Sequence, residues 1–367
     1  MRDEKKTNMN SYPNAPLLSV IIPVYNAQDV VYDLLEDVRN QTFTNIEVIM
    51  INDGSTDNSG EICKEFTEKD SRFIYLYQEN RGVSDARNYG ISIAAGYYIA
   101  FLDADDRIPL NRFEIMIKIM EDDKTIDLLL SRYAVKVENG EFPYSLWQSE
   151  ARGKQSVEKL IMDFARSMTS FYYGAIWNKL YKRDIMEKYN IRFEKSVSWG
   201  EDLLFNLRYF EHVEYCYFMT EETYYYCYTD GSLLSDTSIY EPQIDFIRYD
   251  RIIELGERLE DEQVHAAYVK EADRLLLNQI TRRMSLKASG KKSSDAAYQE
   301  FKDYIQAPEV MAFWEDEDND RYKNVRVFCL IHKLTKKRQY RLVFHLFRLK
   351  EKLKKNRVNG VLFKLFK

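Results

Sequence analysis

Carboxylates gather in three short segments of the chain, and each segment could carry part of one reaction. The first is NDGSTD, residues 52–57, which directly follows the apolar residues 48–51. An apolar run of this kind predicts a buried strand, so Asp53 is expected at a strand end. There its carboxylate can accept hydrogen bonds from an imide N–H or a ribose hydroxyl. Ser, Thr and Asp also cap helices, so a helix N-cap is the alternative.

The second segment is DADD, residues 103–106, which follows the apolar run 97–102. Its three carboxylates, Asp103, Asp105 and Asp106, repel one another unless a cation neutralises them. Oxygen ligands of this kind suit Mg²⁺ or Mn²⁺, which keep open positions for a substrate diphosphate. The alternative is a solvated acidic turn that caps the helix from Leu110.

The third segment is GED, residues 200–202, at the start of an apolar helix. A general base needs a carboxylate held close to an acceptor hydroxyl, and this segment could supply one. Capping of the helix by acids near its positive end is the alternative. Between the first two segments, Arg81 and Arg87 flank a helix start, where phosphate can bind. An ordinary solvated helix start explains that pattern too.

Short apolar strands alternate with helices through the first 102 residues, and this alternation must position the three segments. Strands are expected at residues 18–24, 47–51, 73–77 and 97–102, and helices at 30–38, 60–66 and 84–95. Such alternation predicts an α/β fold with a mainly parallel sheet flanked by helices. Functional residues should then gather at the carboxyl ends of its strands.

The pattern loosens after residues 127–137. Residues 138–156 are expected as a loop, residues 157–235 alternate helices with aromatic-rich segments, and long helices follow from residue 240 to 286. We therefore divide the chain into a polar tail (1–15), an α/β domain (16–237), a helical extension (238–320) and a basic amphipathic tail (321–367).

Composition excludes several classes of protein. Of the 367 residues 45% are hydrophobic and 14% aromatic, which is too apolar for a disordered chain. No run approaches the ~18 apolar residues of a membrane-spanning helix, and the first residues are too polar for a secretory signal. Four distant cysteines indicate neither a disulfide framework nor a zinc site. The sequence has neither GxG nor GxxxxGK, which excludes the dinucleotide and Walker phosphate loops. We expect a soluble protein of a reducing compartment.

The charge is distributed unevenly. Residues 321–367 contain sixteen Lys and Arg against one acid, Glu351, and so carry +15, which leaves −21 on the rest of the chain. On an expected helix over residues 339–355, one stripe is made of leucines and another of basic residues, and Phe363 and Phe366 follow. This pattern suggests an anionic membrane surface as a partner. Docking on the acidic body and a dimer contact are the alternatives, and without a nucleic-acid motif we expect no nucleic acid.

Together, five segments closely resemble family 2 glycosyltransferases of the GT-A fold over residues 17 to 235. They are SVIIPVYN (19–26), INDGSTDNS (51–59), NRGVSDARNYGI (80–91), GYYIAFLDADD (96–106) and WGEDLLF (199–205). The resemblance implies a Rossmann-like GT-A domain, here with a C-terminal helical extension. Two positions depart from the family pattern: Asn52 stands where a second aspartate is usual, and Thr229 where many capsule- and exopolysaccharide-type members place Arg or His.

The resemblance also implies roles for individual residues on the donor side. Asp53 would contact the uracil of a UDP-sugar, and Asp105 the ribose or sugar. Asp106 would bind the metal, Mn²⁺ or Mg²⁺, together with Asp103. The remaining donor contacts would come from Pro23, Tyr25, Arg81 and Asp85.

On the acceptor side, Asp202 matches the catalytic base of the family. Glu201 lies beside it and is assigned to the acceptor. Trp177, in the segment IWNKLY, could stack on an acceptor sugar, with core packing as the alternative.

The resulting expectation is a metal-dependent, inverting glycosyltransferase that moves a sugar from a nucleotide-sugar to a saccharide. We expect the acceptor to be lipid-linked, in surface polysaccharide synthesis, with the enzyme at the inner face of the membrane. Transfer to polyprenyl phosphate is one alternative, and a catalytically inactive nucleotide-sugar-binding partner of an assembly complex is another. A sugar-nucleotide pyrophosphorylase would need a glycine-rich loop that the sequence lacks.

Overall fold

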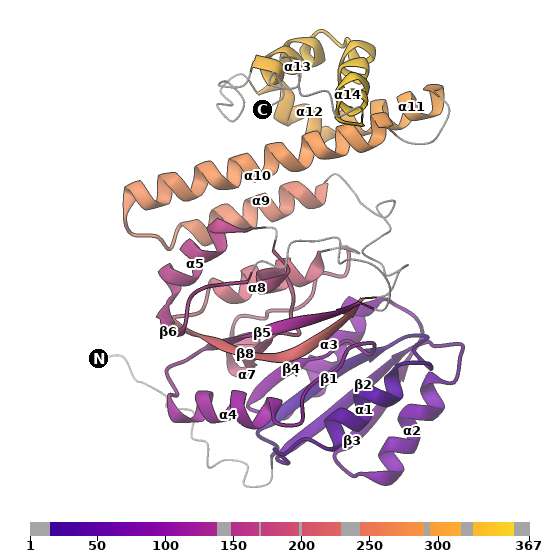
Figure 1. Cartoon of the computed structure of the whole chain (residues 1–367), viewed down its shortest axis with the longest axis vertical. Coiled ribbons are helices and arrows are strands. Elements are labelled where there is room, and N and C mark those ends of the chain that lie inside the picture. The colour runs from indigo at the N-terminus through magenta and orange to yellow at the C-terminus, as the bar shows by residue number, and fades with distance from the viewer. Residues whose placement is uncertain are drawn as a thin grey trace. The chain divides into compact units, whose positions relative to one another are not determined.

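The computed structural model describes residues 15–137, 148–168, 170–197, 200–228, 243–289, 294–316 and 326–355. The chain divides into two compact units, Met1–Ile239 and Tyr240–Lys367. Figure 1 shows a sheet with its helices in the first unit and helices in the second. Trp199, Thr229, Phe363 and Phe366 lie outside the described residues.

Four parallel strands form one half of the sheet in the first unit. They are β1 (Leu18–Val24), β2 (Ile46–Asp53), β3 (Phe73–Gln78) and β4 (Tyr98–Phe101). The helices α1 (Val31–Arg39), α2 (Ser59–Lys69) and α3 (Val83–Ile93) connect them. Every residue of β1 and β4 is buried except Pro23, as expected for parallel strands that helices cover on both faces.

The strand order reverses at β1. The chain places β2 and β3 on one side of β1 and then returns to add β4 on the other, which gives the order β3-β2-β1-β4. In open α/β sheets, ligands bind at the carboxyl ends of the strands where the order reverses. Tyr25 follows β1 and Asp103 follows β4 closely, so the predicted donor residues lie at this reversal.

The other half of the sheet is mixed. It continues from β4 in the order β7 (Lys179–Lys182), β5 (Leu128–Val137), β8 (Tyr215–Tyr228), β6 (Gly153–Ser156). Strand β7 runs antiparallel to β4 and β5, and β6 antiparallel to β8, whereas β5 and β8 are parallel. The remaining helices are α4 (Arg112–Asp122), α5 (Val157–Arg166), α6 (Phe171–Gly174), α7 (Arg183–Lys188) and α8 (Glu201–Phe210). The mostly parallel α/β fold is confirmed, although β6 lies in a stretch expected as a loop.

Helix α3 lies very close to β1 and β2 because a glycine faces them. A Cβ atom added at Gly90 would lie 2.5 Å from Ile21 Cγ2 and 3.0 Å from Ile51 Cδ1. Only a residue without a side chain allows this approach without moving the strands. The start of α3 is thereby held beside the strand ends.

The described part of the second unit is helical. Its helices are α9 (Gln243–Gly256), α10 (Glu262–Ser289), α11 (Ser294–Ile305), α12 (Pro308–Glu315), α13 (Arg326–Lys336) and α14 (Tyr340–Lys355). One hydrophobic core includes Phe301, Trp314, Phe344 and Phe347, so α14 packs together with the helical extension. On the same helix Leu342 and Leu349 are 51% and 45% exposed. Nowhere in the described ranges is a helix both long and apolar enough to cross a membrane.

Candidate functional site

The loops after β1 and β2 are joined by hydrogen bonds between side chains and backbone. Asn26 has a positive φ of 48°, its N–H donates to Ser55 Oγ (3.0 Å), and its side-chain oxygen accepts from Thr56 N (2.9 Å). Asn52 accepts from Ser55 N (2.8 Å) and donates from its amide to the Tyr75 hydroxyl (3.0 Å). The amide at position 52 thus accepts one hydrogen bond and donates another. These hydrogen bonds fix the loops after β1 and β2 relative to each other.

Asp53 anchors the loop that leads into α3. Its Oδ1 accepts from Gln78 Nε2 (2.7 Å) and Arg81 N (2.9 Å), and its Oδ2 accepts from Gly82 N (2.8 Å). The side chain is 4% exposed and caps no helix. Because a carboxylate oxygen accepts two hydrogen bonds, Oδ2 has room for one more donor.

The other predicted donor residues surround this end of the sheet. Pro23 is half-buried in β1, Tyr25 is 51% exposed, and Arg81 is exposed. In the described part of the chain neither the Tyr25 hydroxyl nor the Arg81 guanidinium has a hydrogen-bond partner, so both are free to meet a ligand. Asp85 differs, because it pairs with Lys195.

Asp106 is fully buried against β8. Its Oδ2 accepts from the Tyr224 hydroxyl (2.5 Å), and its Oδ1 accepts from Cys227 N (2.8 Å). Burial, with the charges of Asp105 and Asp103, holds the pKa of Asp106 well above its usual range. The structure therefore places the predicted metal ligand Asp106 at a position that is 0% exposed, where its two hydrogen bonds fasten the DADD turn to β8.

Asp105, in the same turn, is exposed where Asp106 is buried. Its side chain is exposed, and among the described residues its only hydrogen-bond donor is its own backbone N–H. Protein atoms still surround the carboxylate on several sides, and this desolvation, with the charge of Asp103, raises the pKa of Asp105 to about 6. A cation that bound there would lower the pKa again.

A single buried arginine joins the second and third acidic segments. Arg87 from α3 is 4% exposed and donates from Nη2 to Asp103 Oδ1 at 2.9 Å. Its Nη1 donates to Asp202 Oδ1 at 2.8 Å and to Glu201 Oε1 at 3.3 Å. The three carboxylates raise the pKa of Arg87, although burial opposes them. The DADD turn and the start of α8 thus meet at one guanidinium.

Asp202 stands in the first turn of α8, after Gly200 in the left-handed region (φ 85°). Its carboxylate bonds Arg87, and as an acid in the first turn of α8 it also lies near the positive end of that helix, so the dipole alternative holds beside the contact with Arg87. Although 24% of the side chain is exposed, surrounding protein desolvates the carboxylate and raises the pKa of Asp202 to about 8, against the opposing charge of Arg87. A base with a pKa near neutrality is well matched to proton transfer.

Two further contacts join α3 to the chain before α8. Asn88 donates from Nδ2 to Phe193 O (2.9 Å) and accepts from Phe193 N (2.8 Å), and Lys195 pairs with Asp85. These pairs are more than 100 residues apart in the sequence.

Trp177 is part of the core. It is 3% exposed and stacks on Tyr224 with a centroid distance of 4.4 Å. Its carbonyl accepts from the buried Arg112 at 2.7 Å. No ring face is open to a sugar, so the packing alternative describes Trp177, whereas Glu201 lies beside Asp202 on Arg87.

The donor set suits a metal that binds together with a diphosphate. Within the described ranges no cluster of three or more His, Cys, Asp or Glu could hold a metal by itself. Mg²⁺ usually takes only one or two carboxylates and completes its shell with water and substrate phosphates. Asp105, with Asp103 two residues away and 28% exposed, meets that need.

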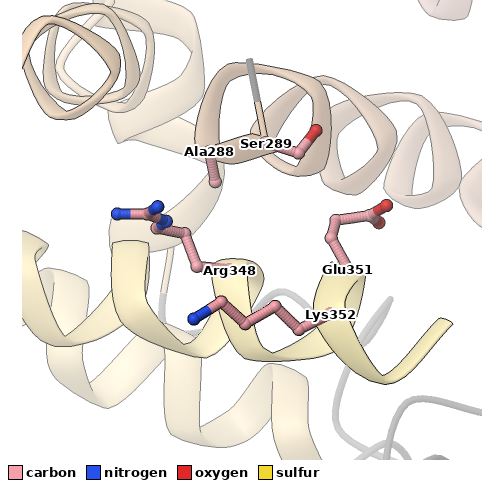
Figure 2. A pocket seen from close by; sticks show the side chains of 5 residues that line it. All are labelled: Ala288, Ser289, Arg348, Glu351 and Lys352. Carbon is pink, nitrogen blue, oxygen red and sulfur yellow. The ribbon is translucent and has the colours of Figure 1, made fainter. Parts of the chain in front are cut away.

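The recess in Figure 2 belongs to the second unit. Ala288 and Ser289 at the end of α10 and Arg348, Glu351 and Lys352 of α14 line it. The acidic segments of the first unit contribute nothing to this recess.

The comparisons with known proteins identify the family of the first unit. The family model for Glycosyl transferase family 2 matches residues 19–189. The first unit is a family 2 glycosyltransferase domain. The matched residues include the loop of Asp53, Arg87 and the DADD turn of this family 2 domain, and they end before Asp202.

Two relatives share the family 2 domain. The uncharacterized glycosyltransferase EpsJ of Bacillus subtilis (strain 168) is 31% identical over 231 residues, which are 63% of this chain and 66% of EpsJ. Glycosyltransferase GlyA of Streptococcus pneumoniae serotype 4 is 33% identical over 220 residues, which are 59% of this chain and 31% of GlyA. The matches therefore span less than two thirds of either relative.

A solved structure shares the fold. Staphylococcus aureus TarS 1–349, crystallised in complex with UDP-GlcNAc, superimposes with a TM-score of 0.63 and 17% identity over 92% of each chain. This similarity confirms the expected GT-A fold with C-terminal helices.

The sequence did not predict that Arg87 joins the DADD turn to the start of α8. The place of Arg87 near a helix start indicates a phosphate site instead. The available signal is that Arg87 lies one helical turn before Gly90, on the buried side of α3, because a buried arginine needs acidic partners.

Proposed function

We propose that this chain transfers a sugar from a UDP-sugar to a hydroxyl of a saccharide acceptor, with inversion, in the synthesis of a surface polysaccharide. One observation carries the proposal: Arg87 holds Asp103 of the donor turn and Asp202 of α8 on one guanidinium. The family 2 domain and the UDP-GlcNAc complex of TarS, which has the same fold, support a nucleotide-sugar donor.

The nucleotide would lie at the carboxyl ends of β1 and β2. Asp53 Oδ2 has room to accept the N3–H of uracil, and the exposed ring of Tyr25 offers a face for the base beside Pro23. The free guanidinium of Arg81 can reach phosphate from the loop before α3. Asp85 would act less directly, through its pair with Lys195.

The diphosphate would lie at the DADD turn, where we assign the metal-facing position to Asp105, with Asp103 next to it. When bound, Mn²⁺ or Mg²⁺ would neutralise the charge that develops on the departing diphosphate. Asp106 holds the turn in place through Tyr224 and Cys227.

On the acceptor side, Asp202 would take the proton of the acceptor hydroxyl as that oxygen attacks the anomeric carbon. The bond from the anomeric carbon to the diphosphate oxygen breaks in the same displacement, and UDP leaves with the electron pair. A single displacement from the opposite face inverts the anomeric configuration. Glu201, on the same arginine, borders the acceptor position.

Thermal shift with UDP, GDP, CDP and dTDP, each with and without Mn²⁺, tests the donor assignment. A ligand at ~100 times its Kd adds ~2.7 kcal/mol to the free energy of unfolding, which is readily visible. We expect a metal-dependent shift with UDP that Asp53→Ala and Asp105→Asn each reduce. A metal-dependent shift with another nucleotide would overturn the UDP assignment. Binding of UDP without turnover of any UDP-sugar would favour an inactive partner, and a sugar on polyprenyl phosphate would change the acceptor.

A lipid-linked acceptor would require contact with a membrane, and we propose α14 for that contact. Its exposed Leu342 and Leu349 lie seven residues apart, on one stripe of the helix, in a segment that carries +15. Apolar side chains within a basic surface suit the headgroup region of an anionic bilayer at the inner face of the membrane.

Vesicle flotation tests this contact. Deleting the tail would remove Phe344 and Phe347 from the core, so point variants are the better test. The full chain should float with phosphatidylglycerol vesicles and not with phosphatidylcholine, and the double variant Leu342→Ser, Leu349→Ser should not float. Leu286→Ser, at a leucine of α10 that is 45% exposed, is the matched control. Equal flotation of the double variant and this control would contradict the proposal.

A further inference from the structure

Helix α3 contacts both sides of the site. Its leading loop is bound by Asp53 through Arg81 N and Gly82 N, on the donor side. Its middle is bound to the acceptor side, where Asn88 exchanges two hydrogen bonds with Phe193. Gly90 then fixes the helix against β1 and β2, since any side chain there would strike Ile21.

Arg87 lies at the centre of these contacts. Its two terminal nitrogens face different partners: Nη2 takes Asp103, and Nη1 takes Asp202 and Glu201. A guanidinium is planar, so the directions of these hydrogen bonds are fixed relative to one another. The distance and angle between the DADD turn and the head of α8 are therefore set by one rigid group.

Removing this cation would affect all three carboxylates at once. Each is half-buried, with side-chain exposures of 28% for Asp103, 13% for Glu201 and 24% for Asp202. Without Arg87 no cation would offset the repulsion between those that are ionised, and the start of α8 would move away from the turn to relieve it. A displacement of 1 Å at reacting groups can cost about 100-fold in rate.

We propose that Arg87 is a positioning residue, whose guanidinium sets the place of the Asp202 carboxylate relative to the DADD turn and hence to the anomeric carbon of the donor. The inference rests on the proposed function. In this proposal Arg87 does not contact the donor, because both of its terminal nitrogens donate hydrogen bonds to carboxylates.

Kinetics of Arg87→Met and Arg87→Lys, next to UDP binding by calorimetry with Mn²⁺, test the assignment. For Arg87→Met we expect kcat to fall about 100-fold while the Kd of UDP stays within about threefold. Lysine restores the charge without the fork, so Arg87→Lys should recover part of the lost kcat. Arg72→Met is the control, because Arg72 pairs with Asp70 at the start of β3, at the opposite end of that strand from Asp53's partner Gln78.

A loss of kcat in Arg87→Met no greater than in Arg72→Met would overturn the proposal. A Kd for UDP weakened as much as kcat would overturn it too, and would make Arg87 a donor-binding residue. If the methionine variant does not fold, the lysine variant carries the test, since it keeps the buried positive charge.

Hydrogen exchange separates this proposal from the proposed function, because it needs no substrate. Peptides across α8, residues 201–210, should exchange about tenfold faster in Arg87→Met than in the unmodified chain, and no faster in Arg72→Met. If the unmodified chain turned over no UDP-sugar, the proposed function would fall, and faster exchange in α8 would still support the positioning role. Unchanged exchange in α8 would contradict that role.

Discussion

The donor side and the acceptor side of this site are held by different kinds of interaction. On the donor side, the loops after β1 and β2 share several short hydrogen bonds between neutral groups and backbone, and Asp53 adds three more. On the acceptor side, the head of α8 is held mainly through charge, at Arg87. A loop held by several hydrogen bonds keeps its position when one is lost, whereas carboxylates held by one buried arginine lose all of their ion pairs when that arginine is removed. The folded arrangement of the donor loops should therefore withstand the loss of one hydrogen bond between them, whereas the position of Asp202 should be sensitive to the loss of Arg87.

The largest expected effect is the loss of kcat in Asp202→Asn, a variant that should lose transfer and keep UDP binding. Asp202→Asn removes the group that takes the acceptor proton but touches none of the donor ties, so kcat should fall by about 10³-fold while UDP still binds. Initial rates of UDP release and calorimetry of UDP with Mn²⁺ measure the two quantities. Asp122→Asn, at an exposed acid at the end of α4, is the control. Turnover retained by Asp202→Asn would remove the base assignment.

The next prediction compares Asp105 with Asp106, the exposed and the buried acid of the DADD turn. Asp105→Asn should raise the Mn²⁺ concentration needed for half-maximal rate by about 100-fold without lowering the Tm, because desolvation and the charge of Asp103 disfavour the ionised Asp105 in the folded chain. Asp106→Asn should instead lower the free energy of unfolding by about 1–3 kcal/mol, since its amide would face the Tyr224 hydroxyl in a buried site. Metal titration and thermal unfolding distinguish the two variants. The reverse pattern would return the metal to Asp106, as the sequence alone suggested.

A smaller effect should appear in the pH dependence. Only the deprotonated Asp202 accepts a proton, and its pKa is raised to about 8, so kcat should increase about tenfold per pH unit below that value and level off above it. The charged and titratable groups that face this carboxylate are Arg87, Glu201, Asp103, Lys179 and Tyr181. A rate that is flat from pH 6 to 8 would contradict this role for Asp202. UDP binding over the same range serves as the control.

Much of this site could be predicted from the sequence because strand ends in a parallel sheet converge. Asp53 and Asp103 each follow an apolar run, and that alone placed them at one edge. A different signal, two acids at the start of an apolar helix, indicated Glu201 and Asp202. Which acid of the DADD turn is exposed could not be predicted, because the answer depends on β8, whose Tyr224 and Cys227 lie about 120 residues away.

Tertiary contacts also decided the cases in which a pattern allowed two outcomes. The sequence allowed Trp177 to face a sugar or the core. It lies in the core, where it stacks on Tyr224 and its carbonyl accepts a hydrogen bond from Arg112. On α14 the leucine stripe was visible in the sequence, yet the face that meets the core carries Phe344 and Phe347. A helix with two apolar faces does not reveal which one is covered until its neighbours are known.

The smallest expected effect on catalysis tests the packing that both sides share. Gly90→Ala places a methyl group against Ile21 and Ile51 and should lower the free energy of unfolding by about 1–3 kcal/mol. The kcat of the folded fraction should fall less than in Arg87→Met, because the guanidinium of Arg87 and its three carboxylate partners are all retained. Gly174→Ala is the matched control, since a Cβ there meets nothing within 4 Å. Equal Tm values for the two variants would show that α3 can move away from the strands.

The central claim is a single displacement by an acceptor hydroxyl that Asp202 activates, at a donor held by the strand ends. The anomeric configuration of the product, determined by proton NMR during turnover of an α-linked UDP-sugar, tests this claim most directly. The account predicts a β-linked product from the unmodified chain and none from Asp202→Asn. An α-linked product would contradict it, because retention requires a different mechanism from the one that this arrangement of carboxylates supports.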